Sequence, residues 1–236
     1  MSEDPMAAST DDLLRRLRGF QGASGRRPRP RLHELLDGTR HASALFIGCS
    51  DLRVVPHLLT GTGPGELLVL RNIGALVPRC GCTEGDVHAT AATLEYALVA
   101  QQARHIVVCG HSRCGAMRSL YGGVPAGAPH LAAWLDLARE AVLPAPPDAQ
   151  VLRRTEERSV VLQLVRLMEY PLVRERVQAG ELALHGWHYD VDDGEVRVYD
   201  AESGEFVPAS RADPEPAAAY ARRPGAHKPA AAAWSS

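Results

Sequence analysis

Three short runs of apolar residues constrain the fold of this chain more than any other feature. They span residues 44–48, 67–70 and 105–109, and turn-forming or polar residues bound each run. Continuous apolar runs of this length are typical of strands buried in a parallel sheet. Residues 86–101, between the second and third runs, have the apolar spacing of a helix. This alternation predicts the α/β class, with a mostly parallel β-sheet flanked by helices.

The remaining predicted elements complete one domain. A hydrophobic content of 45% in 236 residues suits a single core. We expect that domain over residues 31–207, with a Gly/Pro/Arg-rich arm at 1–30 and an Ala/Pro-rich disordered tail at 208–236, so both termini are expected to be flexible. The Asp192-Asp193-Gly194 segment indicates a hairpin. The other predicted elements are helices over 11–18, 31–37, 131–141 and 151–169, a helix that begins near Gly115, and strands over 182–190 and 195–199.

The composition limits the partners and the compartment. The formal net charge is −2, which favours neither nucleic acid nor an anionic membrane surface as a partner. No apolar run approaches the roughly 20 residues that span a bilayer. The acidic start of the chain lacks the basic and apolar regions of a signal peptide. The five cysteines are irregularly spaced, which favours metal or thiol chemistry over disulfides. We therefore expect a cytoplasmic protein.

Cys49, His111 and Cys114 form a candidate metal-ligand set. Cys49 follows the first predicted strand, His111 lies just past the third, and Cys114 precedes a predicted helix. Because sites in open parallel sheets form beyond the carboxyl ends of strands, we expect these side chains to meet. Two thiolates and one imidazole suit Zn²⁺, and three protein ligands leave a fourth position open, as in catalytic zinc sites.

Asp51 and Arg53 lie next to the first predicted ligand. Zn²⁺ with two thiolates and a neutral imidazole has no net charge, so the metal alone activates water less than a three-histidine site does. An ionised Asp51 can orient a zinc-bound water or hydroxide, and Arg53 can hold that carboxylate through a bidentate pair. The alternative is a surface ion pair without a chemical role.

Five short motifs follow one another along residues 31–200. They are CSDLR at 49–53, RNIG at 71–74, LEYA at 94–97, CGHSRCG at 109–115 and GWHYD at 186–190. In this order they resemble the β-class carbonic anhydrases. The resemblance implies a zinc enzyme that reversibly hydrates CO₂ to bicarbonate and a proton through zinc-bound hydroxide. It also implies a mostly parallel sheet and a homodimer or higher homo-oligomer with the site at the subunit interface.

The resemblance assigns roles to the candidate site residues. Cys49, His111 and Cys114 would be the zinc ligands, and Asp51 and Arg53 would be the catalytic pair. Two positions depart from the family pattern: Leu52 stands where Ser is common, and Ala75 stands where the final Asn of Arg-Asn-x-Gly-Asn is common. Both changes remove a polar group, so lower activity or a related hydrolase of another small substrate such as CS₂ is an alternative.

A second hypothesis is a non-catalytic zinc-binding module. Asp51, Cys80 or Cys82 could supply a fourth ligand and close the site. Cys80 and Cys82 could also form a redox-sensitive pair, but two unrelated loop cysteines are the simpler interpretation. Cys109 lies in an apolar strand and is expected in the core. His57 and His88 are candidate proton shuttles, with a bystander role as the simpler interpretation.

Overall fold

The computed structural model describes residues 42–63, 65–81 and 88–209 of the chain. These residues fall within the unit His41–Ser236. The predicted arm, the helices expected at 11–18 and 31–37, and the tail beyond residue 209 lie outside the described residues, so the domain boundaries stay predictions. Within the described part, no helix is both long enough and apolar enough to cross a membrane.

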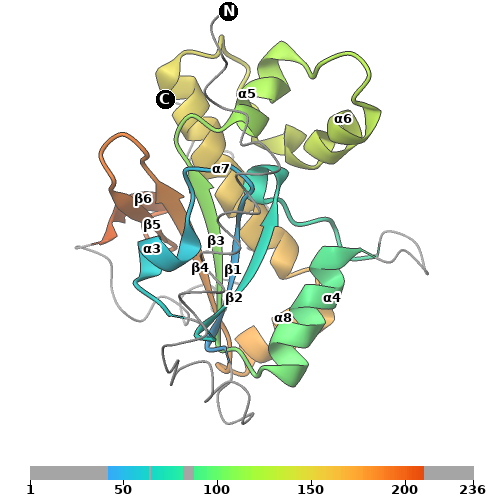
Figure 1. Ribbon diagram of the computed structural model, residues 1–236, viewed down its shortest axis with the longest axis vertical. Helices are drawn as coiled ribbons and strands as arrows, with labels where there is room; N and C mark the ends of the chain where they lie inside the picture. Colours follow the sequence, from blue (N-terminus) through green and yellow to red (C-terminus); the bar gives the residue numbers. More distant parts are fainter. Residues whose placement is uncertain (1–41, 64, 82–87, 210–236) are drawn as a thin grey trace, which may run out of the picture. The chain divides into compact units, whose positions relative to one another are not determined.

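A six-stranded mixed sheet is the centre of the structure (Figure 1). Its strands stand in the order β2-β1-β3-β4-β5-β6. The first four strands of that order pair in parallel, and β5 and β6 add two antiparallel pairings. The predicted α/β fold is therefore confirmed. The strand bounds are β1 (Ala44–Cys49), β2 (Leu67–Asn72), β3 (His105–His111), β4 (Ala183–Tyr189), β5 (Val196–Asp200) and β6 (Glu205–Pro208).

The strand order places two carboxyl ends side by side at a topological switch point. The chain leaves β1 for β2 on one side, and β3 pairs with the other side of β1. In open parallel sheets, such a reversal creates a crevice beyond the strand ends, where ligands bind. Cys49 ends β1 and His111 ends β3, so both residues reach this crevice.

Alternating side chains of the strands pack into two separate layers. On one face, Leu45, Ile47 and Ile106 join the largest apolar cluster, together with residues of α4 (Ala89–Glu95), α7 (Ala149–Leu167) and α8 (Pro171–Gln178). On the other face, Phe46 and Val107 pack with residues near α3 (Pro56–Thr60). Continuous burial of β1 and β3 on both faces explains why their sequences are continuously apolar.

A close approach between α7 and the sheet depends on a small residue. A Cβ atom added to Gly110 would lie 2.7 Å from Cγ2 of Val160, closer than carbon atoms pack. The N-terminus of α7 is capped by Asp148, whose carboxylate accepts the Val151 N–H at 2.8 Å. Because Gly110 has no side chain, helix α7 packs directly against β3, the strand that carries His111.

Several elements differ from their predicted bounds. The helix expected over 86–101 is α4 followed by the π-helix η2 (Tyr96–Ala100), and the helix expected over 131–141 is α6 (Pro129–Leu135) followed by the 3₁₀ helix η3 (Asp136–Ala141). Helices α3 and α8 and strand β6 were not predicted. Each is eight residues or shorter, so its apolar pattern repeats too few times to be distinguished from a loop.

Candidate metal centre and catalytic pair

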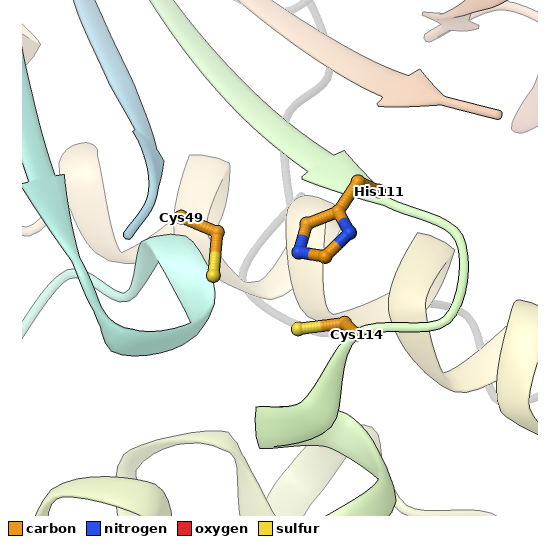
Figure 2. A group of neighbouring side chains, drawn as sticks. All are labelled: Cys49, His111 and Cys114. Carbon is orange, nitrogen blue, oxygen red and sulfur yellow. The ribbon is translucent and has the colours of Figure 1, made fainter. Parts of the chain in front are cut away.

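The three predicted ligands converge on one point (Figure 2). The Sγ atoms of Cys49 and Cys114 and a ring nitrogen of His111 all lie within 4.8 Å of one another. Cys49 is the last residue of β1, His111 is the last residue of β3, and Cys114 directly precedes α5 (Gly115–Gly122). All three side chains are buried. The predicted set is therefore assembled by the switch point of the sheet.

The state of the His111 ring fits a metal ligand. Nδ1 lies 2.9 Å from the carbonyl oxygen of Ser112, an acceptor, so Nδ1 carries the hydrogen and Nε2 keeps a lone pair. Nε2 is buried and has no hydrogen-bond partner among the described residues. A buried nitrogen without a partner is costly unless a ligand completes it. Two sulfurs and this nitrogen are the donor types that zinc prefers.

The two thiols are electrostatically linked. The pKa of Cys49 is lowered to about 4, chiefly because Cys114 donates a hydrogen bond to its sulfur, while burial opposes the shift. The same hydrogen bond and burial raise the pKa of Cys114. The Gly74 N–H also donates to Cys49 Sγ at 3.4 Å, from a backbone with φ of +80°. The pair readily holds one proton, which a divalent cation would displace.

Arg53 holds Asp51 beside the ligand set. Its Nε donates to Oδ1 at 2.8 Å and its Nη2 donates to Oδ2 at 2.7 Å. These bonds keep the pKa of Asp51 well below its usual range, although burial opposes the shift. Oδ2 lies 4.0 Å from Nε2 of His111. The carboxylate is thus next to the candidate metal position, and Arg53 occupies both of its oxygens.

The RNIG motif supports the loop that carries Asp51. Arg71 donates to the carbonyl oxygen of Cys49 at 3.1 Å and to that of Asp51 at 2.6 Å. The Asn72 side chain accepts from the Leu76 N–H at 2.7 Å and donates to its carbonyl oxygen at 2.8 Å. The Arg71 bonds fix the backbone of the loop after β1, and the Asn72 bonds fix the backbone on either side of Gly74. The sequence identified the motif, and its positioning role follows from the tertiary contacts.

The two departures from the family pattern occupy different environments. Leu52 has 90% of its surface exposed, so its side chain points away from the ligands. Ala75 is buried and has φ of +55°, a left-handed conformation that costs an alanine about 1 kcal/mol or more. It lines a cavity of about 10 Å³ next to the three ligands, together with Met117 and Val160. Ala75 is therefore the departure that lies beside the ligands.

The other candidates among the described residues are not part of the ligand group. Cys80 packs against the largest apolar cluster and is not part of the ligand group, while Cys82 lies outside the described residues. Cys109 is buried as expected, and burial raises its pKa to about 12. The His88 ring accepts from the Ala91 N–H at 3.2 Å and so caps α4.

Glu156 of α7 was missed by sequence reasoning. It is buried, and its Oε1 accepts the Cys114 N–H at 3.0 Å. A signal was present: Val160, Leu164 and Leu167, which are buried, follow Glu156 at helical spacing. An acid on the apolar face of a helix indicates a buried polar partner.

Comparison with known proteins agrees with this geometry. The carbonic anhydrase family pattern matches residues 44–196. A carbonic anhydrase of Pseudomonas aeruginosa is 42% identical over 180 residues, which cover 72% of this chain and 79% of that protein. The solved structure of the β-carbonic anhydrase CcaA has 33% identity and a TM-score of 0.77, with 90% of this chain and 96% of that chain covered.

A second solved structure extends the comparison. One of two tetrameric β-carbonic anhydrases from Sordaria macrospora has 26% identity and a TM-score of 0.65, with 79% of this chain and 94% of that chain covered. The relatives share the predicted class, and the expectation of a carbonic anhydrase is confirmed. The motifs, the fold and the assembled ligand set agree with these matches: the chain belongs to the β-carbonic anhydrase family.

Proposed function

We propose that this chain is a zinc enzyme that reversibly hydrates CO₂ to bicarbonate and a proton, with Cys49, His111 and Cys114 as the zinc ligands. One observation carries the proposal. The buried Nε2 of His111 has no partner among the described residues and faces two sulfurs, while Asp51 is held 4.0 Å from it. This arrangement offers three ligands and an adjacent, immobilised carboxylate.

When bound, zinc supplies a Lewis acid that makes water a stronger nucleophile near neutral pH. Asp51 would accept a hydrogen bond from the attacking water oxygen, so that a lone pair of this oxygen points at the carbon of CO₂. One C–O bond forms, one C=O bond becomes single, and the proton lost by water passes to solvent buffer. Asp51 therefore acts by orientation, since Arg53 already keeps it ionised.

The hold of Arg53 on Asp51 favours the enzyme over the closed, non-catalytic module. A carboxylate that accepts two guanidinium hydrogen bonds is restrained from turning onto the metal. Cys80 packs in a different cluster, so it does not supply a fourth ligand in the described structure. The proposal predicts that the fourth position remains available to water and substrate.

Ala75 is the reason to keep a second candidate reaction. Ala75 lines the cavity beside the ligands, at a position where the family commonly has a polar Asn. A more apolar cavity also suits a small apolar heterocumulene, so hydrolysis of CS₂ remains the alternative. Measuring CO₂ hydration and CS₂ hydrolysis on the same zinc-loaded sample separates the two reactions.

The deciding experiment replaces Asp51 by Asn. We expect Asp51→Asn to keep one zinc per chain and to lose CO₂ hydration by at least about 100-fold in stopped flow, the scale for loss of a group that orients the reacting atoms. Asp136→Asn is the matched control, because Asp136 pairs with Arg139 on the surface. Near-normal turnover of Asp51→Asn would overturn the assigned role.

We also propose a homodimer or higher homo-oligomer. Leu52, Val55 and Leu58 are exposed large apolar residues within one short segment at the start of α3. The tetrameric relatives from Sordaria macrospora support an assembly.

We also propose a cytoplasmic location, because Cys49, Cys80, Cys109 and Cys114 form no disulfide bond.

A further inference from the structure

The peptide group that joins Arg113 to Cys114 is held from both sides. Its carbonyl oxygen accepts from Nη2 of Arg53 at 3.1 Å. Its N–H donates to Oε1 of Glu156 at 3.0 Å. The first partner belongs to the loop after β1 and the second to α7. This peptide immediately precedes the Cα atom of a predicted zinc ligand, so its orientation decides where the Cys114 side chain points.

Glu156 is itself fixed by a buried partner. Its Oε2 lies 3.1 Å from Nε2 of His188, and both side chains are almost fully buried. An ionised carboxylate only accepts hydrogen bonds, so His188 supplies the hydrogen to an ionised Glu156. His188 lies on β4, opposite Gly110 of β3 in the register. The carboxyl group is thus anchored to the strand next to the one that carries His111.

A carboxylate at this position requires an explanation. Taking a carboxylate out of water is costly, and removal of that cost needs well-placed hydrogen bonds. Val160 and Leu164, one and two turns later on the same helix face, are apolar and buried. An apolar residue at 156 would fill the helix stripe without that cost, but it would leave both the Cys114 N–H and Nε2 of His188 unpaired. The two hydrogen bonds, one to the ligand turn and one to His188, together account for the acid.

The turn before Cys114 is also unfavourable by itself. Arg113 has φ of +58°, in the left-handed region that non-glycine residues rarely adopt. Such a conformation persists only when the surroundings over-determine it. Because the Arg113 side chain is exposed and pairs with Asp192, the contacts that hold the backbone are those at the peptide itself.

We propose that Glu156 is a positioning residue for the metal centre: with Arg53 on the opposite side, it fixes the Arg113–Cys114 peptide so that Cys114 Sγ is held toward Cys49 and His111. The inference rests on the proposed zinc site. Glu156 acts through the backbone of Cys114 and does not touch substrate. Loss of this restraint should loosen one of the three ligands.

The test compares Glu156→Leu with Glu156→Gln in the zinc-loaded protein. Leu has a similar volume and no acceptor. The Gln oxygen can still accept the Cys114 N–H, and its NH₂ group can then donate to Nε2 of His188 once that ring carries its hydrogen on Nδ1, which has no partner among the described residues. We expect zinc release to a chelator to be at least about tenfold faster in Glu156→Leu, the scale of other supporting contacts at metal ligands. Glu156→Gln should stay within about threefold of the wild type.

Cobalt substitution gives a readout that general destabilisation does not move. We expect the thiolate-to-cobalt and d–d absorption bands of Glu156→Leu to shift, and those of Glu156→Gln to match the wild type. The matched control is Thr155→Val, because Thr155 is buried on the same helix and bonds to Tyr121, away from the ligand turn. That control should lower stability and leave zinc release and the cobalt bands unchanged.

The outcomes separate the two proposals. Wild-type protein without one zinc per chain, or without a thiolate-to-cobalt band, would overturn the zinc site and this inference with it. Normal metal binding in the wild type, with unchanged zinc release in Glu156→Leu or equal damage in Glu156→Gln, overturns only the positioning role. If Glu156→Leu does not fold, Glu156→Asp replaces it. Its carboxylate is one methylene short of the Cys114 N–H, and wild-type zinc release from that variant would overturn the role.

Discussion

Arg53 binds both carboxylate oxygens of Asp51, with its Nε 2.8 Å from Oδ1 and its Nη2 2.7 Å from Oδ2. The Arg53 side chain is 41% exposed and that of Asp51 is 20% exposed. A pair this exposed contributes on the order of 1 kcal/mol or less to folding. Its consequence is geometric, since it fixes the direction in which Asp51 presents its lone pairs next to His111.

Replacement of Arg53 should therefore damage turnover more than stability. We expect Arg53→Ala to lower kcat for CO₂ hydration by about 100-fold, because Asp51 becomes free to rotate. Zinc content should stay at one per chain, because Glu156 still holds the Arg113–Cys114 peptide through the Cys114 N–H. Arg53→Lys should recover only part of the loss, since an ammonium cannot bind both oxygens in a planar fork. Stopped flow and metal analysis on one sample give both quantities.

The control for Arg53 is Arg139→Ala. Arg139 also pairs with an aspartate on the surface, donating through Nε and Nη2 to Oδ1 of Asp136, and its removal should leave kcat unchanged. If Arg53→Lys matches the wild type, a single point charge suffices and the bidentate geometry is unimportant.

The described cysteines should differ sharply in reactivity toward iodoacetamide. In the zinc-loaded protein, Cys80 should react first, because it is half-buried and away from the ligand group. Cys109 should react at least about 100-fold more slowly, because it is buried and its pKa is about 12. Cys49 and Cys114 should become labelled only after zinc removal. Peptide mass spectrometry resolves the sites, and equal labelling of Cys49 and Cys114 with and without zinc would contradict their assignment as ligands.

His185 should make stability fall in mild acid. Its pKa is lowered to about 4, chiefly by burial and further by the His105 ring, whose Nδ1 lies 3.1 Å from its Nε2. In the unfolded chain the pKa is near 6.5, so between pH 6.5 and 4 the unfolded state binds more protons. The contribution of neutral His185 to the free energy of unfolding is therefore fully present above pH 6.5. It is lost as the pH falls, by up to about 2 kcal/mol at pH 5.0.

Urea unfolding at pH 7.5 and 5.0 checks the contribution of His185. We expect His185→Gln to lose less free energy of unfolding between the two pH values than the wild type does. His130→Gln on α6 is the control, since His130 is exposed and should leave the difference unchanged. An unaltered pH difference in His185→Gln would show that other groups carry the acid sensitivity.

Leu58 should contribute to the proposed interface between subunits. It is 80% exposed on α3, and a charge there would be buried in any assembly that covers this face. We expect Leu58→Asp to shift the protein toward monomer in sedimentation velocity at micromolar concentration, because an unpaired buried charge is costly. Val99→Asp, an exposed apolar position on η2, tests the opposite face of the sheet. If Val99→Asp dissociates the assembly and Leu58→Asp does not, the interface lies on the face that carries η2.

The candidate ligand set and the main strands could be predicted from local patterns in the sequence. The strands β1 and β3 are continuously apolar because both of their faces are buried, and that pattern is visible without any partner. The donor types of Cys49, His111 and Cys114 indicated zinc before their positions were known. Short elements such as β6 lack enough repeats of a pattern, so they were missed.

The tertiary structure decided what the sequence left open. From the sequence, Leu52 and Ala75 are both departures that remove a polar group. In the folded chain, Leu52 is exposed and Ala75 is buried beside the ligands. Helix α7 brings Glu156 to the N–H of Cys114, and the loop after β1 brings Arg53 to the carbonyl of the same peptide. The amino-acid sequence by itself determined which groups can bind metal and which segments must be buried, because those properties are local. Which groups meet depends on the strand order and on the distance between packed layers, and only the folded chain sets these.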